Sequence, residues 1–156
     1  MTPSQARNAI KKSLKALVDP KPTKEEKEQI WRYFENECGY CGCSLDPKGR
    51  QAHLDHLIAD ADGGSNRLCN LILTCAICNG DEKRELAWQE FLLQKCNDET
   101  PEYFDRYEKI INWFELQDGT AMISEEQKED IDTAFNKINV LYSEVVEQLR
   151  KQYKQI

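Results

Sequence analysis

Long apolar runs are absent from this sequence, and no stretch approaches the roughly 20 apolar residues that a membrane-spanning helix requires. Residues 1–12 also lack the apolar core of a secretory signal. Neither an internal repeat nor a low-complexity tract is visible. We therefore expect a soluble globular protein that is neither inserted in a membrane nor exported, and that resides in the cytoplasm.

The chain also lacks an excess of basic residues, and its formal net charge is −7 at pH 7. Residues 97–156 carry −7, while residues 1–37 and 38–96 carry +2 and −2. Strong nonspecific binding to nucleic acid comes from neutralised phosphates, so this balance argues against it for the chain alone. A nuclease is not excluded, since catalytic carboxylates account for part of the negative charge. Affinity for nucleic acid would then come from a local basic face or from a partner.

An even number of cysteines is also lacking: the chain has seven, so any disulfide scheme leaves one thiol unpaired. Without an export signal, a reducing compartment and metal binding are favoured over disulfides. Four of the cysteines form two Cys-x-x-Cys pairs, Cys38/Cys41 and Cys75/Cys78. Two such pairs can supply four thiolates to one tetrahedral zinc. The alternative is four buried free cysteines, which are common singly but rare as two pairs at this spacing.

The other three cysteines are less suitable as metal ligands. Cys43 competes with Cys41 as a ligand, although its one-residue spacing fits a zinc site less well. Cys69 and Cys96 are most simply thiols of the hydrophobic core.

Helix signals dominate both ends of the chain. Thr2 and Thr23 begin capping boxes, which predict helices that end before Asp19-Pro20 and near Asn36. Short strands are expected at 51–57 and 71–74, followed by a helix from Asn79 to about Cys96. Further helices are predicted over 100–117 and from Ser124 almost to Ile156. The predicted fold is α+β and mainly helical, divided into an N-terminal helical segment (1–29), a zinc-stapled core (30–96) and a C-terminal helical segment (97–156).

The last helix carries a heptad seam that must be buried somewhere. An intramolecular hairpin with the helix over 100–117 is slightly favoured, because Asp118-Gly119 makes a short turn. A homodimer or a partner protein is the alternative. The seam consists of Ile131, Phe135, Ile138, Tyr142, Val145 and Leu149.

Between the two cysteine pairs lies the dipeptide Asp55-His56, followed by Gly63-Gly64 and by Asn70, and Asn79 comes directly after the last cysteine. An Asp-His pair alone is more often a surface hydrogen-bonding pair than a catalyst. Neighbouring strand residues also face opposite ways, so these two serve one site only if the strand ends or twists there. The combination is what indicates a hydrolytic metal site.

The central block resembles the HNH nuclease family, whose fold is a ββα-metal motif. The resemblance covers about residues 30–95 and rests on the two cysteine pairs and on Leu54-Asp55-His56-Leu57-Ile58, Gly63-Gly64-Ser65-Asn66 and Asn70-Leu71-Ile72-Leu73-Thr74. His56 matches the first H and Asn70 the N, while Asn79 replaces the final histidine. Ala59 stands where the family usually has a proline.

The resemblance implies an endonuclease that hydrolyses phosphodiester bonds and leaves a 5′ phosphate and a 3′ hydroxyl. His56 would be the general base, and Asp55 and Asn79 would hold a catalytic magnesium or manganese ion. Asn70 would fix the loop that orients His56. DNA is the expected substrate, with RNA as a second candidate.

Three more residues are candidates for substrate binding. His53 shares a strand face with Asp55, so a contact to metal or phosphate and a plain surface position are equally supported. Lys83 and Arg84 follow Asn79 closely enough to bind a flanking phosphate. The alternative is that both belong to a solvated helix face.

Three hypotheses about function follow. The first is a metal-dependent HNH endonuclease acting on DNA. The second is a zinc-stapled nucleic-acid-binding or adaptor module that recruits a partner through its C-terminal helix. The third is the nuclease subunit of a larger bacterial or phage assembly, such as a defence or restriction system. Presence of Asp55, His56, Asn70 and Asn79 together favours an enzyme, because an adaptor has no need of them.

Overall fold

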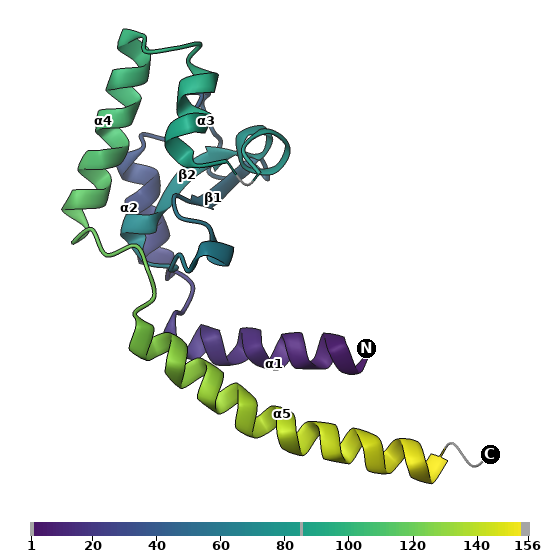
Figure 1. Ribbon diagram of the computed structural model, residues 1–156. Helices are drawn as coiled ribbons and strands as arrows, with labels where there is room; N and C mark the ends of the chain where they lie inside the picture. The colour runs from purple at the N-terminus through teal and green to yellow at the C-terminus, as the bar shows by residue number, and fades with distance from the viewer. Residues whose placement is uncertain (1, 85, 154–156) are drawn as a thin grey trace. The chain divides into compact units, whose positions relative to one another are not determined.

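A computed structural model describes residues 2–84 and 86–153 of the chain (Figure 1). This part of the chain is mainly helical with a two-stranded antiparallel sheet, as the sequence predicted. It divides into two compact units, one made of residues 1–20 and 123–156 and the other of residues 21–122. The elements in chain order are α1 (Pro3–Val18), α2 (Lys24–Tyr33), β1 (Ala52–His56), η1 (Asp60–Asp62), η2 (Leu68–Asn70), β2 (Leu71–Cys75), η3 (Ile77–Glu82), α3 (Trp88–Lys95), α4 (Pro101–Leu116) and α5 (Glu125–Tyr153).

Side-chain caps begin the helices where the sequence predicted them. Thr2 and Thr23 each accept a hydrogen bond from the backbone N–H three residues on, and Gln5 and Glu26 accept from the caps in return. Thr100 caps α4 by accepting from the N–H of Tyr103 at 3.2 Å, with proline at the first helical position. These bonds satisfy N–H groups that every helix start leaves unpaired.

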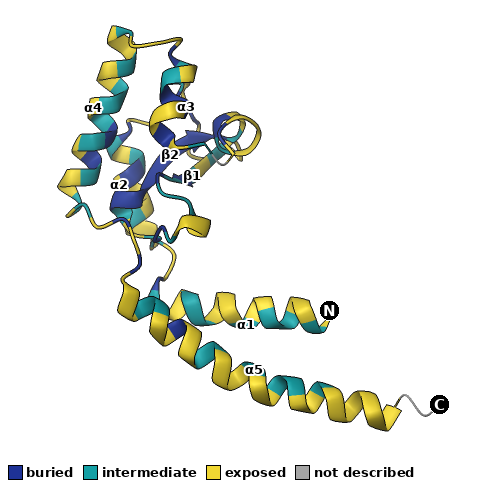
Figure 2. Cartoon of the chain, in the orientation of Figure 1, coloured by how far each residue is buried: buried dark blue, intermediate teal, exposed yellow. Residues whose placement is uncertain are grey.

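The sheet lies at the centre of the unit 21–122. β1 pairs antiparallel with β2, so that His53 lies opposite Thr74 and His56 opposite Leu71. Every residue of β2 is buried, as in a strand covered on both faces. Figure 2 shows the buried residues concentrated on β2 and the helices around it. The core includes Ile30, Phe34, Tyr40, Leu73, Phe91, Leu92, Ile110 and Trp113.

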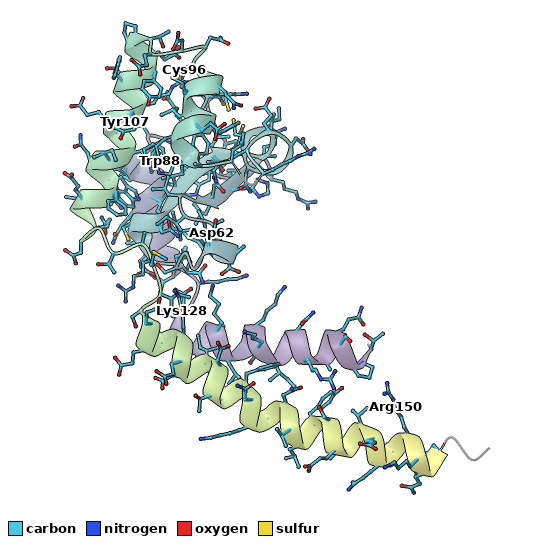
Figure 3. All side chains as sticks on the ribbon, viewed as in Figure 1. Asp62, Trp88, Cys96, Tyr107, Lys128 and Arg150 are labelled. Carbon is cyan, nitrogen blue, oxygen red and sulfur yellow. The ribbon has the colours of Figure 1, made fainter. Side chains whose placement is uncertain are left out.

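Helix α4 is fixed to this core by polar and aromatic contacts. The indole N–H of Trp113 donates to the carbonyls of Leu68 and Leu71, each at 2.9 Å. On α3 and α4, the rings of Trp88 and Tyr107 stack with their centroids 5.2 Å apart (Figure 3). The apolar stripe of α4 is therefore used within this unit.

In the other unit, α1 and α5 pack antiparallel. The Lys11 ammonium forms an ion pair of 2.9 Å with Asp132, and the Arg7 guanidinium donates to Ser143 Oγ at 3.1 Å. The same guanidinium lies over the ring of Tyr142, 5.8 Å from its centroid. No helix in the described part of the chain is both long and apolar enough to cross a membrane.

The partner of α5 differs from the one that the sequence favoured. Helix α5 packs along α1, whereas α4 packs against α3 and η2. The hairpin prediction was made because the stripes of α4 and α5 match. A stripe shows only that a face is buried, and Trp88, η2 and β2 already cover that of α4.

The single helix predicted from Asn79 to about Cys96 is wrong. The structure has a π-helix, η3, and a separate α-helix, α3. Between them Arg84 has a φ of +46°, a left-handed conformation that ends a helix. This break leaves Lys83 directed at β1 rather than at solvent.

Candidate active site and zinc centre

Cysteine side chains gather where the loop of residues 38–43, here called the first cysteine loop, meets the end of β2. The Sγ atoms of Cys38, Cys41, Cys43 and Cys75 all lie within 4.8 Å of one another. Gly42 has a φ of +66°, the left-handed conformation that favours glycine, and it turns the chain back so that Cys38 N–H donates to the carbonyl of Cys43 at 3.0 Å. This turn is why Cys43 joins the cluster.

Cys78 lies beside this cluster rather than within it. Its N–H lies 3.4 Å from Cys75 Sγ, and its thiol forms a hydrogen bond with Cys38. That hydrogen bond is the main reason that the pKa of Cys38 falls to about 5 and that the pKa of Cys78 rises. Five sulfurs therefore surround a site that the sequence assigned to four, and Cys43 stands where Cys78 was expected.

The cluster fits a structural zinc ion. Zinc accepts four thiolates in tetrahedral geometry at about 2.3 Å, which places the sulfurs about 3.8 Å apart. Cys41 Sγ and Cys75 Sγ are 3.8 Å apart. Four of these five sulfurs would hold the ion and join the first cysteine loop to β2 and η3.

Asp55 lies near the end of β1 in a buried polar network. The Tyr40 hydroxyl donates to its Oδ2 at 3.0 Å, and the Lys83 ammonium lies 2.9 Å from the same oxygen. Lys83 also donates to the carbonyl of His56 at 3.0 Å. Burial, followed by the charge of Asp55, raises the pKa of Tyr40 well above its usual value, so its hydroxyl stays a donor.

This network does not fit the divalent cation that the sequence places between Asp55 and Asn79. Carboxylate and amide oxygens suit magnesium or manganese, but Asp55 Oδ2 is already shared by an ammonium and a hydroxyl group. The side chain of Asp55 is only 11% exposed. In this arrangement Asp55 balances the charge of Lys83 rather than that of a metal ion.

His56 ends β1 and is half-buried, on the opposite strand face from Asp55. Its Nε2 lies 3.2 Å from Asn66 Oδ1. With this amide oxygen assigned as the acceptor, Nε2 carries the proton and Nδ1 is the basic nitrogen. Asn66 belongs to the loop motif Gly63-Gly64-Ser65-Asn66, but the sequence assigns it no role, because a contact between residues ten positions apart leaves no local signal.

Asn70 closes the loop that follows His56. Its Oδ1 accepts from Ile58 N–H at 2.8 Å, and its Nδ2 donates to the carbonyls of Ile58 and Ser65 at 3.0 and 2.8 Å. A Cβ at Gly64 would lie 1.9 Å from the Ile58 carbonyl oxygen, so this loop requires glycine there. The loop is therefore tied to the residue before β2, and its anchor Asn70 is fully buried.

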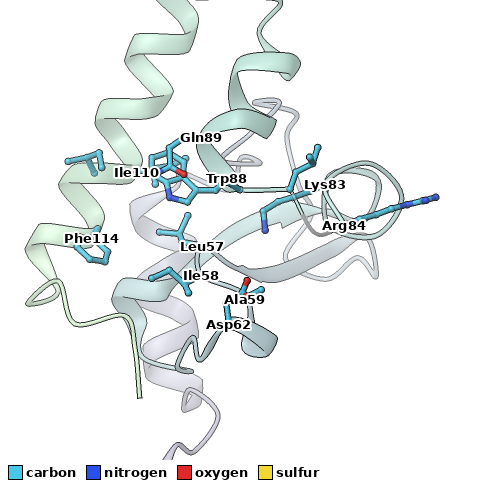
Figure 4. A pocket seen from close by; sticks show the side chains of 13 residues that line it. Leu57, Ile58, Ala59, Asp62, Lys83, Arg84, Trp88, Gln89, Ile110 and Phe114 are labelled. Atoms are coloured by element: carbon cyan, nitrogen blue, oxygen red, sulfur yellow. The ribbon is translucent and has the colours of Figure 1, made fainter. Parts of the chain in front are cut away.

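A cavity of about 450 Å³ begins at the residue after His56 (Figure 4). The loop after β1 forms one wall, and α3 and α4 form the others. Trp88, Ile110 and Phe114 make it largely apolar, while Asp62, Lys83 and Gln89 bring polar groups to it.

The remaining predicted residues lie apart from these contacts. His53 is exposed on β1, with its carbonyl facing Thr74 Oγ1 at 3.4 Å. Arg84 is exposed, donates from Nε to the carbonyl of Asp81, and points away from the cavity (Figure 4). Asn79 is half-buried on η3. Lys83 does not lie on a solvated helix face, because it is buried against Asp55, and its contact with a phosphate stays a prediction.

Residues 38–85 match the HNH endonuclease family. The match confirms the resemblance seen in the sequence, spans both cysteine pairs and the Asp55-His56 dipeptide, and covers less than half of the chain. A comparison of the chain with curated proteins finds no match. The matched segment supports a nuclease-type function, and the cysteine cluster within it fits the zinc-binding members of such a family.

Proposed function

We propose that the chain is an HNH endonuclease that hydrolyses phosphodiester bonds of DNA with His56 as its general base. One observation carries the proposal: a half-buried imidazole at the end of a strand, held by Asn66 and followed by a loop that Asn70 locks. A surface histidine needs no such support. Holding a base in one orientation is what proton abstraction from an attacking water requires.

Within this proposal the two ring nitrogens of His56 have different tasks. Nε2 donates to Asn66 and fixes the ring, while Nδ1 takes the proton of the water that attacks phosphorus. Asn70 acts indirectly, because it holds the backbone of the loop after His56.

The cysteine cluster is proposed to hold zinc for folding, with Cys38, Cys41, Cys75 and Cys78 as ligands. For the reaction, Asp55 and Asn79 remain the proposed ligands of magnesium or manganese, which supplies charge stabilisation at the phosphate when bound. The present contacts of Asp55 Oδ2 require a rearrangement before this oxygen can bind that ion.

DNA is the proposed substrate and RNA the alternative. His53, Lys83 and Arg84 remain candidates for phosphate contacts, and the acidic net charge favours help from a partner. The acidic net charge therefore supports a nuclease subunit of a larger cytoplasmic assembly, such as a bacterial or phage defence or restriction system.

The test is cleavage of supercoiled plasmid, single-stranded DNA and RNA by the zinc-loaded protein, with magnesium, manganese or chelator. His56→Ala should lower the rate roughly 100- to 10,000-fold, because a general base supplies that factor. The chain's other histidine lies on the same strand, and His53→Ala tests a phosphate contact, so it should weaken substrate binding rather than remove the general base. Equal cutting by His56→Ala and the parent rules out His56 as the base.

A second candidate, an adaptor module, is favoured by one observation on α5. Several large apolar side chains of this helix are exposed, including Val140, Leu141 and Leu149. Exposed apolar groups that line one helix are typical of a surface that binds a partner helix. A protein without cleavage activity that assembles through α5 would support this alternative.

A further inference from the structure

The buried lysine of the nuclease unit carries this inference. Lys83 is 4% exposed, and lysine is almost never buried to this extent unless it is paired. Its ammonium contacts Asp55 Oδ2 at 2.9 Å and the carbonyl of His56 at 3.0 Å. Lys83 therefore touches both members of the Asp-His dipeptide on which the proposed chemistry depends.

The ammonium occupies space that a metal ion at Asp55 needs. A divalent cation lies about 2.0–2.6 Å from the carboxylate oxygen that binds it. A cation on Asp55 Oδ2 would thus stand only a few ångströms from the Lys83 ammonium, which contacts the same oxygen. Two positive charges this close repel strongly in a site that water hardly reaches.

We infer that Lys83 is the resident cation of Asp55, and that a divalent cation binds Asp55 Oδ2 only by displacing it. The inference rests on the proposed function, because it takes Asp55 as a ligand of the catalytic ion. Lys83 then sets how much metal the enzyme requires, and metal binding releases a lysine beside His56.

The cavity beside the site has room for the displaced side chain of Lys83. Lys83 lines the cavity beside the site, together with Asp62 and Ile58 (Figure 4). Lys83 caps the end of η3, where its backbone N–H donates to the carbonyl of Cys78, so the displacement requires rotation of its side chain alone. A rotation into the cavity moves the ammonium away from Asp55 and toward the carboxylate of Asp62.

Binding of Mn²⁺ tests the inference without reference to activity. Free Mn²⁺ is followed by electron paramagnetic resonance during titration of the zinc-loaded protein and of Lys83→Met. If Asp55 is free of Lys83 in about one molecule in ten or fewer, the variant binds Mn²⁺ about tenfold tighter or more. Lys109→Met, which removes an equal charge paired with Glu35 elsewhere in the unit, should leave the affinity unchanged.

Two outcomes separate the inference from the proposed metal site. If Asp55→Asn binds Mn²⁺ as well as the parent, Asp55 is not a ligand, and both proposals fail. If Asp55→Asn loses Mn²⁺ but Lys83→Met binds it no tighter than the parent, the metal site stands and the role of Lys83 is wrong.

A measurement on the parent protein covers the case in which Lys83→Met does not fold. A buried, ion-paired ammonium group exchanges its protons slowly with water, so Lys83 should give a ¹H–¹⁵N signal in nuclear magnetic resonance spectra. Saturation with Mg²⁺ should broaden this signal into solvent exchange. A signal that persists unchanged in the Mg²⁺-saturated protein overturns the inference.

Discussion

The Tyr40 hydroxyl donates a hydrogen bond of 3.0 Å to Asp55 Oδ2, and this bond joins the first cysteine loop to the end of β1. Tyr40 stands between Cys38 and Cys41 in sequence and is fully buried. A metal that orders the cysteines therefore also orders the donor that holds Asp55. The cysteine cluster and the proposed active site are parts of one network.

Replacement of Tyr40 by phenylalanine should destabilise the zinc-loaded protein by about 1.5–3 kcal/mol, because a buried hydrogen bond to a charged group is lost. Tyr33→Phe is the matched control, since its hydroxyl donates to the neutral carbonyl of Lys109 and should contribute only about 0.5–1.5 kcal/mol. Urea unfolding at constant zinc measures both. Equal losses in the two variants would show that the charge of Asp55 adds nothing to the bond.

Single serine substitutions should identify the fourth zinc ligand. Cys78→Ser should lose bound zinc and unfold the central block, because binding energy at a structural zinc site is folding energy. Cys43→Ser should keep one zinc per chain, since the Cys-x-x-Cys spacing favours Cys41 over Cys43. Elemental analysis and circular dichroism of the two purified variants decide the question. The reverse result would assign the site to the cluster that contains Cys43.

Loss of the Asn66 oxygen that accepts a hydrogen bond from His56 should slow catalysis without weakening substrate binding. Asn66→Ala removes the oxygen at 3.2 Å from Nε2, and a misplaced base lowers kcat on the order of 100-fold. Asn66→Asp keeps an acceptor and should recover most of the rate. Steady-state kinetics on a short duplex give kcat and KM separately. A variant with unchanged kcat, or with a changed KM alone, contradicts an orienting role for Asn66.

The part of α5 beyond Ser143 should govern self-association, if the chain associates at all. Arg7 near the start of α1 already contacts Ser143, so Val145 and Leu149 lie toward the end of the helix pair, and both are exposed. We expect Val145→Lys with Leu149→Lys to abolish any dimer while leaving the unfolding of the nuclease unit unchanged. Light scattering over a range of concentrations checks this. A mass of one chain at every concentration, in parent and variant alike, excludes a homodimer through this face.

The local features of the fold were predictable from the sequence, whereas its long-range contacts, apart from the meeting of the cysteine pairs, were not. Capping residues and apolar periodicity lie within one or two turns, so the starts of α1, α2 and α4 follow from them. The ion pair of Lys83 with Asp55 joins residues 28 positions apart, and no local pattern reveals it. The π-helix and the left-handed Arg84 likewise escaped prediction, because apolar spacing alone continues across the break.

The sequence predicted which residues belong to the candidate site, but not the contacts that they make with one another. The family motif brought Asp55, His56 and Asn70 together, whereas Tyr40 and Asn66 became visible only through their hydrogen bonds. In the sequence alone, a tyrosine between two cysteines and an asparagine in a glycine-rich loop do not stand out as site residues. Only their hydrogen bonds to Asp55 and His56 identify them as such.

Pairing of α1 with α5 has a consequence for the order in which the chain folds. Helix α1 is synthesised well before α5, because the whole unit of residues 21–122 lies between them in the sequence. That intervening unit is continuous in sequence and can fold while α5 is still unmade. Until α5 has been synthesised, it cannot cover the apolar face of α1, and this face of the nascent chain is exposed to chaperones and proteases.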